Sequence, residues 1–476
     1  MELNQIINNK PSARPFAIGN NPGWYGNHYK DEELYDLMWR AGMRSTRSVI
    51  SINVWNIYGM ETFAERLKYP YKIGMRNNTL VLTTDAYLGE YADQDTTMYG
   101  NKRTIAPKGL FEPIYLKNGS INPRNRFAVY TDEVIRTVGD GYDYFEVMNE
   151  PDLTDNVSEA DDPNRYTHPL SWNNREPGPT ELMNIVAPIK HYVRMHEIAY
   201  TVIKKLKPSA KIATGGLGFP YFFKWCLKYG IEKWVDVLSL HFYPYFEVHE
   251  WSNQLNGFIR FRHSDGHLDA IKRRLDRWRK LWKDEKLAEK PMICTEVNVP
   301  EWEFPDLFNY GSEVMQRNFT AKLFPKMLQW GFDCTYLFVC GQTLKPGQQA
   351  GNAFGAMGLY RSLNDPNIKG KEQLTPQGKL CIYLQTLFDG FVFDEEGTRN
   401  LSTPKDADGI VMKKGKESML VLWAITKKDR SEEARAIYKF KTPFKGRLYE
   451  LDGHMEEISA SEIQLTGEPI ILKASL

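Results

Sequence analysis

Eight short apolar segments recur along residues 15–385, and helical patterns separate most of them. Each segment is nearly continuously apolar, as expected of a strand that is buried on both faces of a parallel sheet. The segments are PFAIG (15–19), STRSVI (45–50), TLVLTT (79–84), YFEVMN (144–149), KIATGG (211–216), VLSLHFY (237–243), PMICTEV (291–297) and TYLFVC (335–340). Eight such strands alternating with helices predict an α/β protein built on a (β/α)8 TIM barrel.

Two of the intervening segments show why helices are expected between the strands. Residues 31–42 place their apolar side chains on one stripe and stop at Gly42, which is typical of a helix end. Residues 267–282 place apolar side chains from Leu268 to Trp282 on one stripe and charges on the opposite face. The basic run of this second segment is therefore predicted to be a solvated helix face and not a nucleic-acid-binding patch.

The pattern changes after residue 385, where helical periodicity gives way to short strand-like runs separated by Gly, Pro and Asp. These runs predict an antiparallel β-sandwich. They lie at residues 409–414, 418–426, 434–441, 447–452 and 468–474. We therefore expect a catalytic barrel over residues 15–385 and a β-sandwich domain over residues 386–476, with residues 1–14 as a candidate for one more strand of the sandwich.

The charge balance and the hydropathy of the chain indicate neither a nucleic-acid partner nor a membrane partner. The chain has 61 basic and 60 acidic residues, a balance that gives no reason to expect nucleic acid or an anionic membrane as a partner. No run of about 18 apolar residues predicts a membrane span. The first residues, MELNQIINNK, lack the apolar core of a signal peptide. A cytoplasmic location is expected for the sequence as it stands, and a periplasmic or secreted one if a leader has been removed. The oligomeric state stays open.

The cysteines indicate neither a disulfide framework nor a zinc site. There are five of them, without CxxC spacing, and Cys294 and Cys340 lie inside apolar runs. They are predicted to be buried thiols. No triplet of Asp, Glu and His has a spacing suited to a metal-dependent lyase, so that barrel chemistry is the least favoured alternative. The sequence predicts no cofactor and no metal.

Two glutamates end predicted strands, Glu150 in YFEVMNEPD (144–152) and Glu296 in PMICTEV (291–297). Pro151 cannot donate a ladder hydrogen bond, so its strand stops there. The C-terminal ends of barrel strands carry catalytic groups. Cleavage of a glycosidic bond needs one carboxyl group to protonate the leaving oxygen and a second to activate water or attack the anomeric carbon. Either glutamate alone is more simply solvated or paired with an arginine, but the pair favours glycosidase chemistry.

The order of three motifs resembles clan A glycoside hydrolases. These are Asn149-Glu150 on the fourth strand, LHFYPY (240–245) on the sixth and Glu296 on the seventh. The resemblance implies a retaining double displacement on a carbohydrate, with Glu150 as acid/base and Glu296 as nucleophile. It also implies that Asn149 binds a sugar 2-hydroxyl and that Tyr243 holds Glu296 ionised. The C-terminal strands are similar to the small domain of β-xylosidase- and iduronidase-like members.

Four further residues are candidates for sugar binding: His241, Arg47, Asp85 and Trp302. Arg47 lies in a buried strand and needs a carboxylate partner, so a purely structural ion pair is an equal alternative. Asp85 follows the third strand, and Trp302 lies six residues beyond Glu296. Each is also compatible with ordinary packing. The competing functional hypothesis is a carbohydrate-binding protein that does not turn over its ligand. Sugar identity, linkage and endo or exo action stay open.

Overall fold

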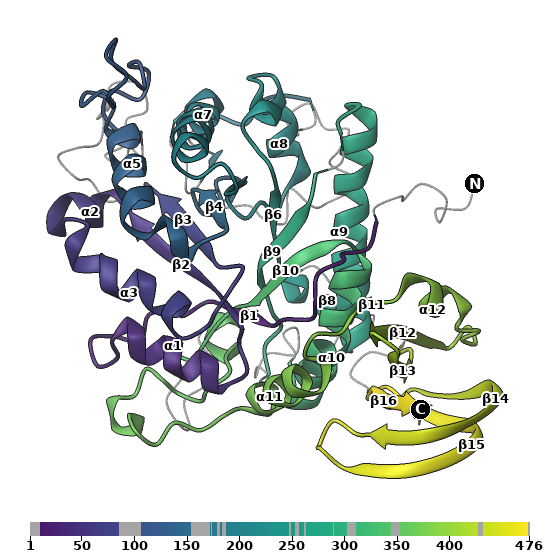
Figure 1. Cartoon of the computed structure of the whole chain (residues 1–476). Coiled ribbons are helices and arrows are strands. Elements are labelled where there is room, and N and C mark those ends of the chain that lie inside the picture. The colour runs from purple at the N-terminus through teal and green to yellow at the C-terminus, as the bar shows by residue number, and fades with distance from the viewer. Residues whose placement is uncertain are drawn as a thin grey trace. The chain divides into compact units, whose positions relative to one another are not determined.

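The structure is a computed structural model, shown in Figure 1. Its contacts divide the chain into two compact units. Unit 1 comprises residues 1–44, 242–279 and 296–476, and unit 2 comprises residues 45–241 and 280–295. The structure describes residues 10–84, 106–153, 172, 174–178, 181–182, 187–246, 249–252, 257–260, 263–288, 290–301, 311–343, 353–426 and 432–474.

Eight parallel strands form one sheet in the order β5-β4-β3-β2-β1-β10-β9-β6. Isolated parallel bridges from Ala213 to Val237 and from Leu217 to Leu240 join the two ends of this order, so the sheet nearly closes into a barrel. The strands are β1 (Gly19–Asn20), β2 (Ser45–Ser51), β3 (Thr79–Thr83), β4 (Tyr144–Val147), β5 (Lys211–Ala213), β6 (Leu238–Phe242), β9 (Met292–Val297) and β10 (Phe332–Leu337). The predicted fold class is confirmed.

Helices follow most of these strands, as the alternation of sequence patterns predicted. They are α1 (Asp31–Arg40), α2 (Ile52–Tyr58), α3 (Glu61–Lys72), α5 (Arg126–Val138), α7 (Ile189–Leu206), α8 (Pro220–Leu227), α9 (Ser264–Asp284), α10 (Glu313–Gln329), α11 (Pro376–Phe388) and α12 (Glu395–Asn400). Among the described helices, none is long and apolar enough to cross a membrane. All five cysteines are buried and free, as predicted.

In unit 2, helix α5 shows how the barrel helices are set against the strands. Asn125 caps the helix, since its side-chain oxygen accepts a hydrogen bond from the Ala128 amide at 3.1 Å. The buried face of α5 includes Phe127 and Tyr130. The Tyr130 hydroxyl donates to the Ile50 carbonyl of β2 at 2.8 Å, which satisfies the polar end of a buried aromatic side chain. The N-cap, the buried apolar face and the hydrogen bond of Tyr130 together fix the position of α5 on the sheet.

The C-terminal sheet belongs to unit 1 and has the strand order β11-β12-β13-β16-β14-β15. Its strands are antiparallel, and its core includes Leu422, Leu448, Leu465 and Leu472. The strands are β11 (Val392–Phe393), β12 (Ala407–Lys414), β13 (Glu417–Ala424), β14 (Arg435–Tyr449), β15 (Met455–Thr466) and β16 (Ile470–Ala474). Residues 10–14 form no strand, and residues 1–9 lie outside the described residues. The boundaries 15–385 and 386–476 stay a prediction.

A buried ion network connects helices of unit 1 to the antiparallel sheet. The Lys322 ammonium group of α10 donates to Asp265 of α9 at 2.8 Å. Asp265 also accepts from the Trp423 indole of β13 at 2.9 Å and from the Thr426 amide at 2.8 Å. The Lys322 charge is fully buried, so this pairing is required for it to remain charged. The two helices and strand β13 are thereby held together by hydrogen bonds as well as by apolar contacts.

Candidate active site

The end of strand β4 has an unusual backbone. Met148 and Glu150 adopt positive φ angles of 70° and 44°, a region that side chains other than glycine rarely occupy. The Glu150 amide donates to the Gly215 carbonyl at 2.6 Å. A Cβ atom added at Gly215 would lie 2.5 Å from the Val147 carbonyl oxygen, so glycine is needed where the chain after β5 approaches β4. These constraints set the direction of the Glu150 side chain, in a conformation of the kind that is concentrated at functional sites.

The Glu150 carboxyl group is paired with a buried histidine. His241 Nδ1 lies 2.8 Å from Glu150 Oε1, and the side chains are 3% and 22% exposed, respectively. The other ring nitrogen, Nε2, lies 2.9 Å from Thr295 Oγ1. Gly216 has a φ angle of 66°, and a Cβ atom there would lie 2.1 Å from Nε2, so the ring sits directly against the glycine. A partly exposed carboxyl group is thus held by a ring that has little room to move.

A buried ion pair lies beneath this pair in unit 2. Arg47 Nε donates to Glu146 Oε2 at 2.6 Å, and Arg47 Nη2 donates to Asn149 Oδ1 at 2.7 Å. Glu146 is therefore the carboxylate partner that the buried Arg47 required. Sequence reasoning missed Glu146, although a glutamate inside the otherwise apolar YFEV strand was a signal for it. Because Asn149 Oδ1 faces Arg47, the orientation of the Asn149 amide is fixed.

Glu296 has a different environment, within unit 1. It is 7% exposed, and its Oε2 atom accepts a hydrogen bond from the Tyr243 hydroxyl. The Tyr243 ring packs edge-on against Phe354 at a centroid distance of 4.9 Å and against Phe338 at 5.9 Å. The contact expected between Tyr243 and Glu296 is therefore present, and packing of the tyrosine ring supports it.

The side chains that contact Glu150 and Glu296 come from residues that are close together in the sequence. His241 lies on β6 and Tyr243 follows it by two residues, while Thr295 directly precedes Glu296 on β9. The partner of Glu150 and the partner of Glu296 are thus supplied by one short segment, and both β6 and β9 end at the carboxyl side of the sheet. This is the side on which barrel enzymes carry their reacting groups.

Asp152 is a further acidic group near Glu150 that sequence reasoning did not single out. It is buried, and burial raises its pKa to about 7, although hydrogen bonds from the Phe219 and Gly218 amides act in the opposite direction. These two amides donate to Asp152 Oδ2 at 2.6 and 2.8 Å. The charge of Glu150 also raises the pKa of Asp152. The signal for this residue was its position in the NEPD motif, two residues beyond Glu150.

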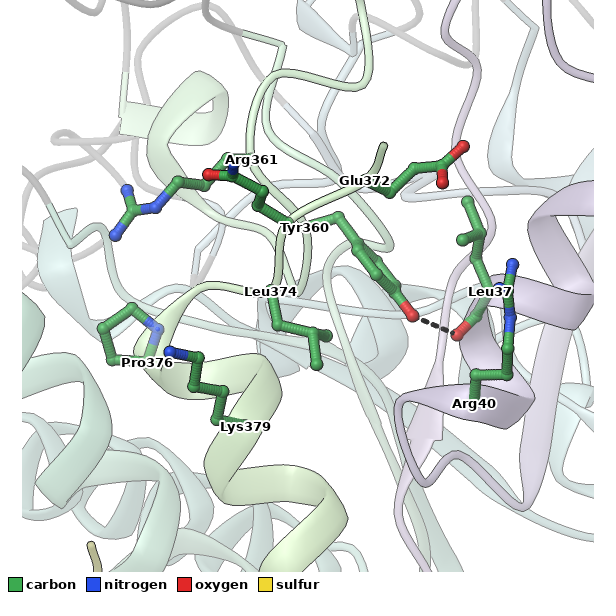
Figure 2. Close-up of a pocket in the computed structure, with 9 residues that line it drawn as sticks. Leu37, Arg40, Tyr360, Arg361, Glu372, Leu374, Pro376 and Lys379 are labelled. Carbon is green, nitrogen blue, oxygen red and sulfur yellow. Dashed lines mark hydrogen bonds between the residues drawn. The ribbon is translucent and has the colours of Figure 1, made fainter. Parts of the chain in front are cut away.

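Two predicted sugar-binding residues, Asp85 and Trp302, lie outside the described residues. A cavity of about 540 Å³ lies in unit 1, and the Tyr360 hydroxyl beside it donates to the Leu37 carbonyl at 2.9 Å. Figure 2 shows residues that line this cavity, among them Arg40 and Lys379. None of the predicted catalytic or sugar-binding residues that the structure describes is among them.

Solved structures share this fold at low sequence identity. A family 39 glycoside hydrolase from the gut symbiont Bacteroides cellulosilyticus WH2 has a TM-score of 0.58 and 15% identity over 97% of this chain and 81% of that chain. A family 30 endoxylanase from Clostridium papyrosolvens C71 has a TM-score of 0.52 and 9% identity over 98% of each chain. A family 39 enzyme from Xanthomonas axonopodis pv. citri has a TM-score of 0.51 and 12% identity over 99% of each chain.

The other two comparisons give no relative by sequence. Neither the protein-family models nor the curated proteins include a match to the chain. The likeness is therefore one of architecture, and it extends over nearly the whole chain, from the parallel barrel to the C-terminal antiparallel sheet. The chain has the fold of glycoside hydrolase families 39 and 30.

Proposed function

We propose that this protein is a retaining glycoside hydrolase that cleaves oligo- or polysaccharides by double displacement, with Glu150 as acid/base and Glu296 as nucleophile. The observation that carries the proposal is the contrast between the two glutamates at the ends of parallel strands. Glu150 is partly exposed and faces a ring nitrogen, whereas Glu296 is buried and accepts a phenol hydrogen bond. Such a contrast lets one carboxyl group hold a proton while the other is ionised. The shared fold supports the same class of reaction.

The reaction then proceeds in two balanced steps. In the first, a Glu296 carboxylate oxygen bonds to the anomeric carbon, the glycosidic bond breaks, and its electron pair goes to the leaving oxygen, which takes the proton of Glu150. In the second, water attacks the anomeric carbon, Glu150 takes the water proton, and the bond to Glu296 breaks. This route requires the two carboxyl groups to be about 5 Å apart across one glycosidic bond.

The surrounding residues receive roles in sugar binding under this proposal. Asn149, whose amide is oriented by Arg47, donates to the sugar 2-hydroxyl, a contact that strengthens in the transition state. Tyr243 holds the Glu296 carboxyl group in position by a hydrogen bond. His241, Asp85 and Trp302 complete the proposed sugar-binding set. The proposed partner is a carbohydrate.

The first experiment replaces each glutamate and measures hydrolysis of a panel of aryl glycosides and polysaccharides. Glu150→Gln and Glu296→Gln should each lower kcat/KM on unactivated glycosides by about 100-fold or more, because general acid catalysis alone contributes roughly 10²–10⁴-fold. Glu396→Gln is a matched control, since Glu396 is exposed on helix α12 and should not matter. Azide should restore turnover to a Glu296→Gly variant. Near-full activity of Glu296→Gln would contradict the mechanism.

A second measurement separates the enzyme from a carbohydrate-binding protein without turnover. An activated 2-deoxy-2-fluoro sugar should label the wild-type protein with time, and peptide mass spectrometry should place the label on Glu296. The Glu296→Gln variant should remain unlabelled under the same conditions. Sugar binding by calorimetry together with neither labelling nor cleavage across the panel would favour the binding protein instead.

A further inference from the structure

A continuous line of hydrogen bonds runs from buried Glu146 to Glu150 within unit 2. Glu146 Oε1 accepts from the Thr295 hydroxyl at 2.7 Å and from the Ser239 hydroxyl. Thr295 Oγ1 lies 2.9 Å from His241 Nε2, and His241 Nδ1 lies 2.8 Å from Glu150 Oε1. Each intermediate group of this line is at most 3% exposed. The line therefore connects the proposed acid/base to a carboxylate that is closed off from solvent.

The direction of these hydrogen bonds follows from counting protons. Glu146 Oε1 accepts the hydroxyl protons of Thr295 and Ser239, whose oxygens lie 2.6 Å from each other. Because the Thr295 proton points to Glu146, Thr295 Oγ1 accepts a hydrogen bond from the Nε2 proton of His241. In a neutral imidazole only one nitrogen carries a proton, so Nδ1 is the acceptor nitrogen. Nδ1 lies 2.8 Å from Glu150 Oε1, so the proton between these two atoms belongs to Glu150.

We propose that Glu146 and Thr295 are positioning residues that fix the tautomer of His241, so that Nδ1 accepts a hydrogen bond from the protonated carboxyl group of Glu150 and this acid holds its proton before each turnover. The inference rests on the proposed role of Glu150 as acid/base. The proton that leaves Glu150 for the leaving oxygen in the first step is replaced by the water proton in the second step. His241 therefore gains and loses no proton over the cycle. Its role is to accept a hydrogen bond from the Glu150 carboxyl group and so keep the proton on Glu150.

Two features of the structure hold this arrangement in place. Arg47 donates to the second oxygen of Glu146 at 2.6 Å, so Arg47 holds Oε2 while Oε1 accepts from Thr295. Gly216 lies directly against the His241 ring, where a Cβ atom would be 2.1 Å from Nε2, so a rotation of the ring is restricted. A change of tautomer therefore has to come from a change in the acceptor of Nε2.

Thr295→Val removes that acceptor while it keeps the shape of the side chain. Without a hydroxyl oxygen beside Nε2, the ring favours the tautomer with a proton on Nδ1, which donates to Glu150 and stabilises its ionised form. Glu150 then lacks the proton that a poor leaving group needs. We expect kcat/KM for a glycoside with a poor leaving group to fall by about 10-fold or more. For a 2,4-dinitrophenyl glycoside, whose leaving group needs little protonation, kcat/KM should stay within about 3-fold of wild type.

Ser239→Ala is the matched control. Ser239 donates to the same oxygen of Glu146 as Thr295 does and lies 2.6 Å from Thr295 Oγ1, but it makes no hydrogen bond to His241 among the described residues. If the line acts through the tautomer of His241, Thr295→Val should show the leaving-group dependence and Ser239→Ala should not. Thr295→Ser, which restores a hydroxyl, should recover most of the activity. Equal losses in Thr295→Val and Ser239→Ala, or a loss that is the same for both leaving groups, would overturn the proposal.

The tautomer of His241 can also be observed directly in the wild-type protein, so this test does not depend on how well a variant folds. In the wild-type protein with 15N-labelled histidine, the ring signals of His241, assigned by their absence in His241→Gln, should show a protonated Nε2. A ring protonated on Nδ1 alone would refute the tautomer assignment. The proposed function is tested separately, because full activity of Glu150→Gln would remove the acid/base role itself, whatever the tautomer of His241.

Discussion

Arg47→Met offers a sharp test of how the barrel interior supports the site. The side chains of Arg47 and Glu146 are 3% and 0% exposed, so water does not screen their interaction. Arg47 donates one hydrogen bond to Glu146 at 2.6 Å and another to Asn149 at 2.7 Å. Hydrogen bonds to charged groups contribute about 1.5–3 kcal/mol each, which gives roughly 3–6 kcal/mol for two. Removal of one partner from a buried ion pair costs about 3–5 kcal/mol, in agreement. We therefore expect Arg47→Met to lower the free energy of unfolding by about 4 kcal/mol.

The assay is urea unfolding followed by tryptophan fluorescence, with Arg136→Met as the control. Arg136 pairs with Asp132 at 2.8 Å within the same unit, but its side chain is 61% exposed. An exposed pair of this kind contributes below about 1 kcal/mol. The double variant Arg47→Met/Glu146→Leu should be more stable than Arg47→Met, because no unpaired buried charge remains. The reasoning is refuted if Arg47→Met and Arg136→Met change the unfolding free energy equally, or if the double variant is the least stable.

Two further predictions concern the groups beside the glutamates. Tyr243→Phe should lower kcat/KM by about 10-fold, and by the same factor for activated and poor leaving groups, because the nucleophile serves both; a leaving-group dependence would contradict the role of Tyr243. Burial raises the folded pKa of Asp152 to about 7 from its ordinary 3.8. Its contribution to stability is therefore complete below about pH 4 and is lost as the pH rises through 7. Unfolding midpoints at pH 5 and pH 8 should show wild type losing stability relative to Asp152→Asn; a constant difference between the two proteins would argue against the raised pKa.

The barrel was predictable because its signal is local and repeated. Every predicted apolar segment overlaps a strand of the parallel sheet, since burial on both faces demands a continuous apolar run. The overlap between residues 15–19 and β1 is Gly19 alone. The predictions failed at the ends of elements. Strand β10 begins at Phe332, three residues before the predicted run. The prediction began too late because Asp333 interrupts the apolar pattern. The Asp333 carboxyl group accepts a hydrogen bond from the Ser12 hydroxyl at 2.8 Å.

The C-terminal sheet shows a second kind of failure. Strand β15 (Met455–Thr466) was missed because most of its side chains are exposed and polar, so that only its backbone pairing with β14 identifies it as a strand. The hairpin of β7 (His249–Ser252) and β8 (Gly257–Arg260) was missed as well. The runs at residues 434–441 and 447–452 are one strand, β14, in which the register shifts between Lys439 and Phe444. Pairing at an edge leaves little trace in the order of apolar residues.

For the site, local sequence patterns were enough to indicate which glutamates end buried strands, because a strand end is marked by neighbours such as Pro151. It also indicated that buried Arg47 needs a carboxylate. Only the tertiary structure identified that carboxylate as Glu146 and connected it through Thr295 and His241 to Glu150. Arg47 lies on β2, Glu146 on β4, His241 on β6 and Thr295 on β9, and Glu150 follows the end of β4. Their hydrogen bonds depend on the register and closeness of strands that lie far apart along the chain, and local patterns carry no information about either.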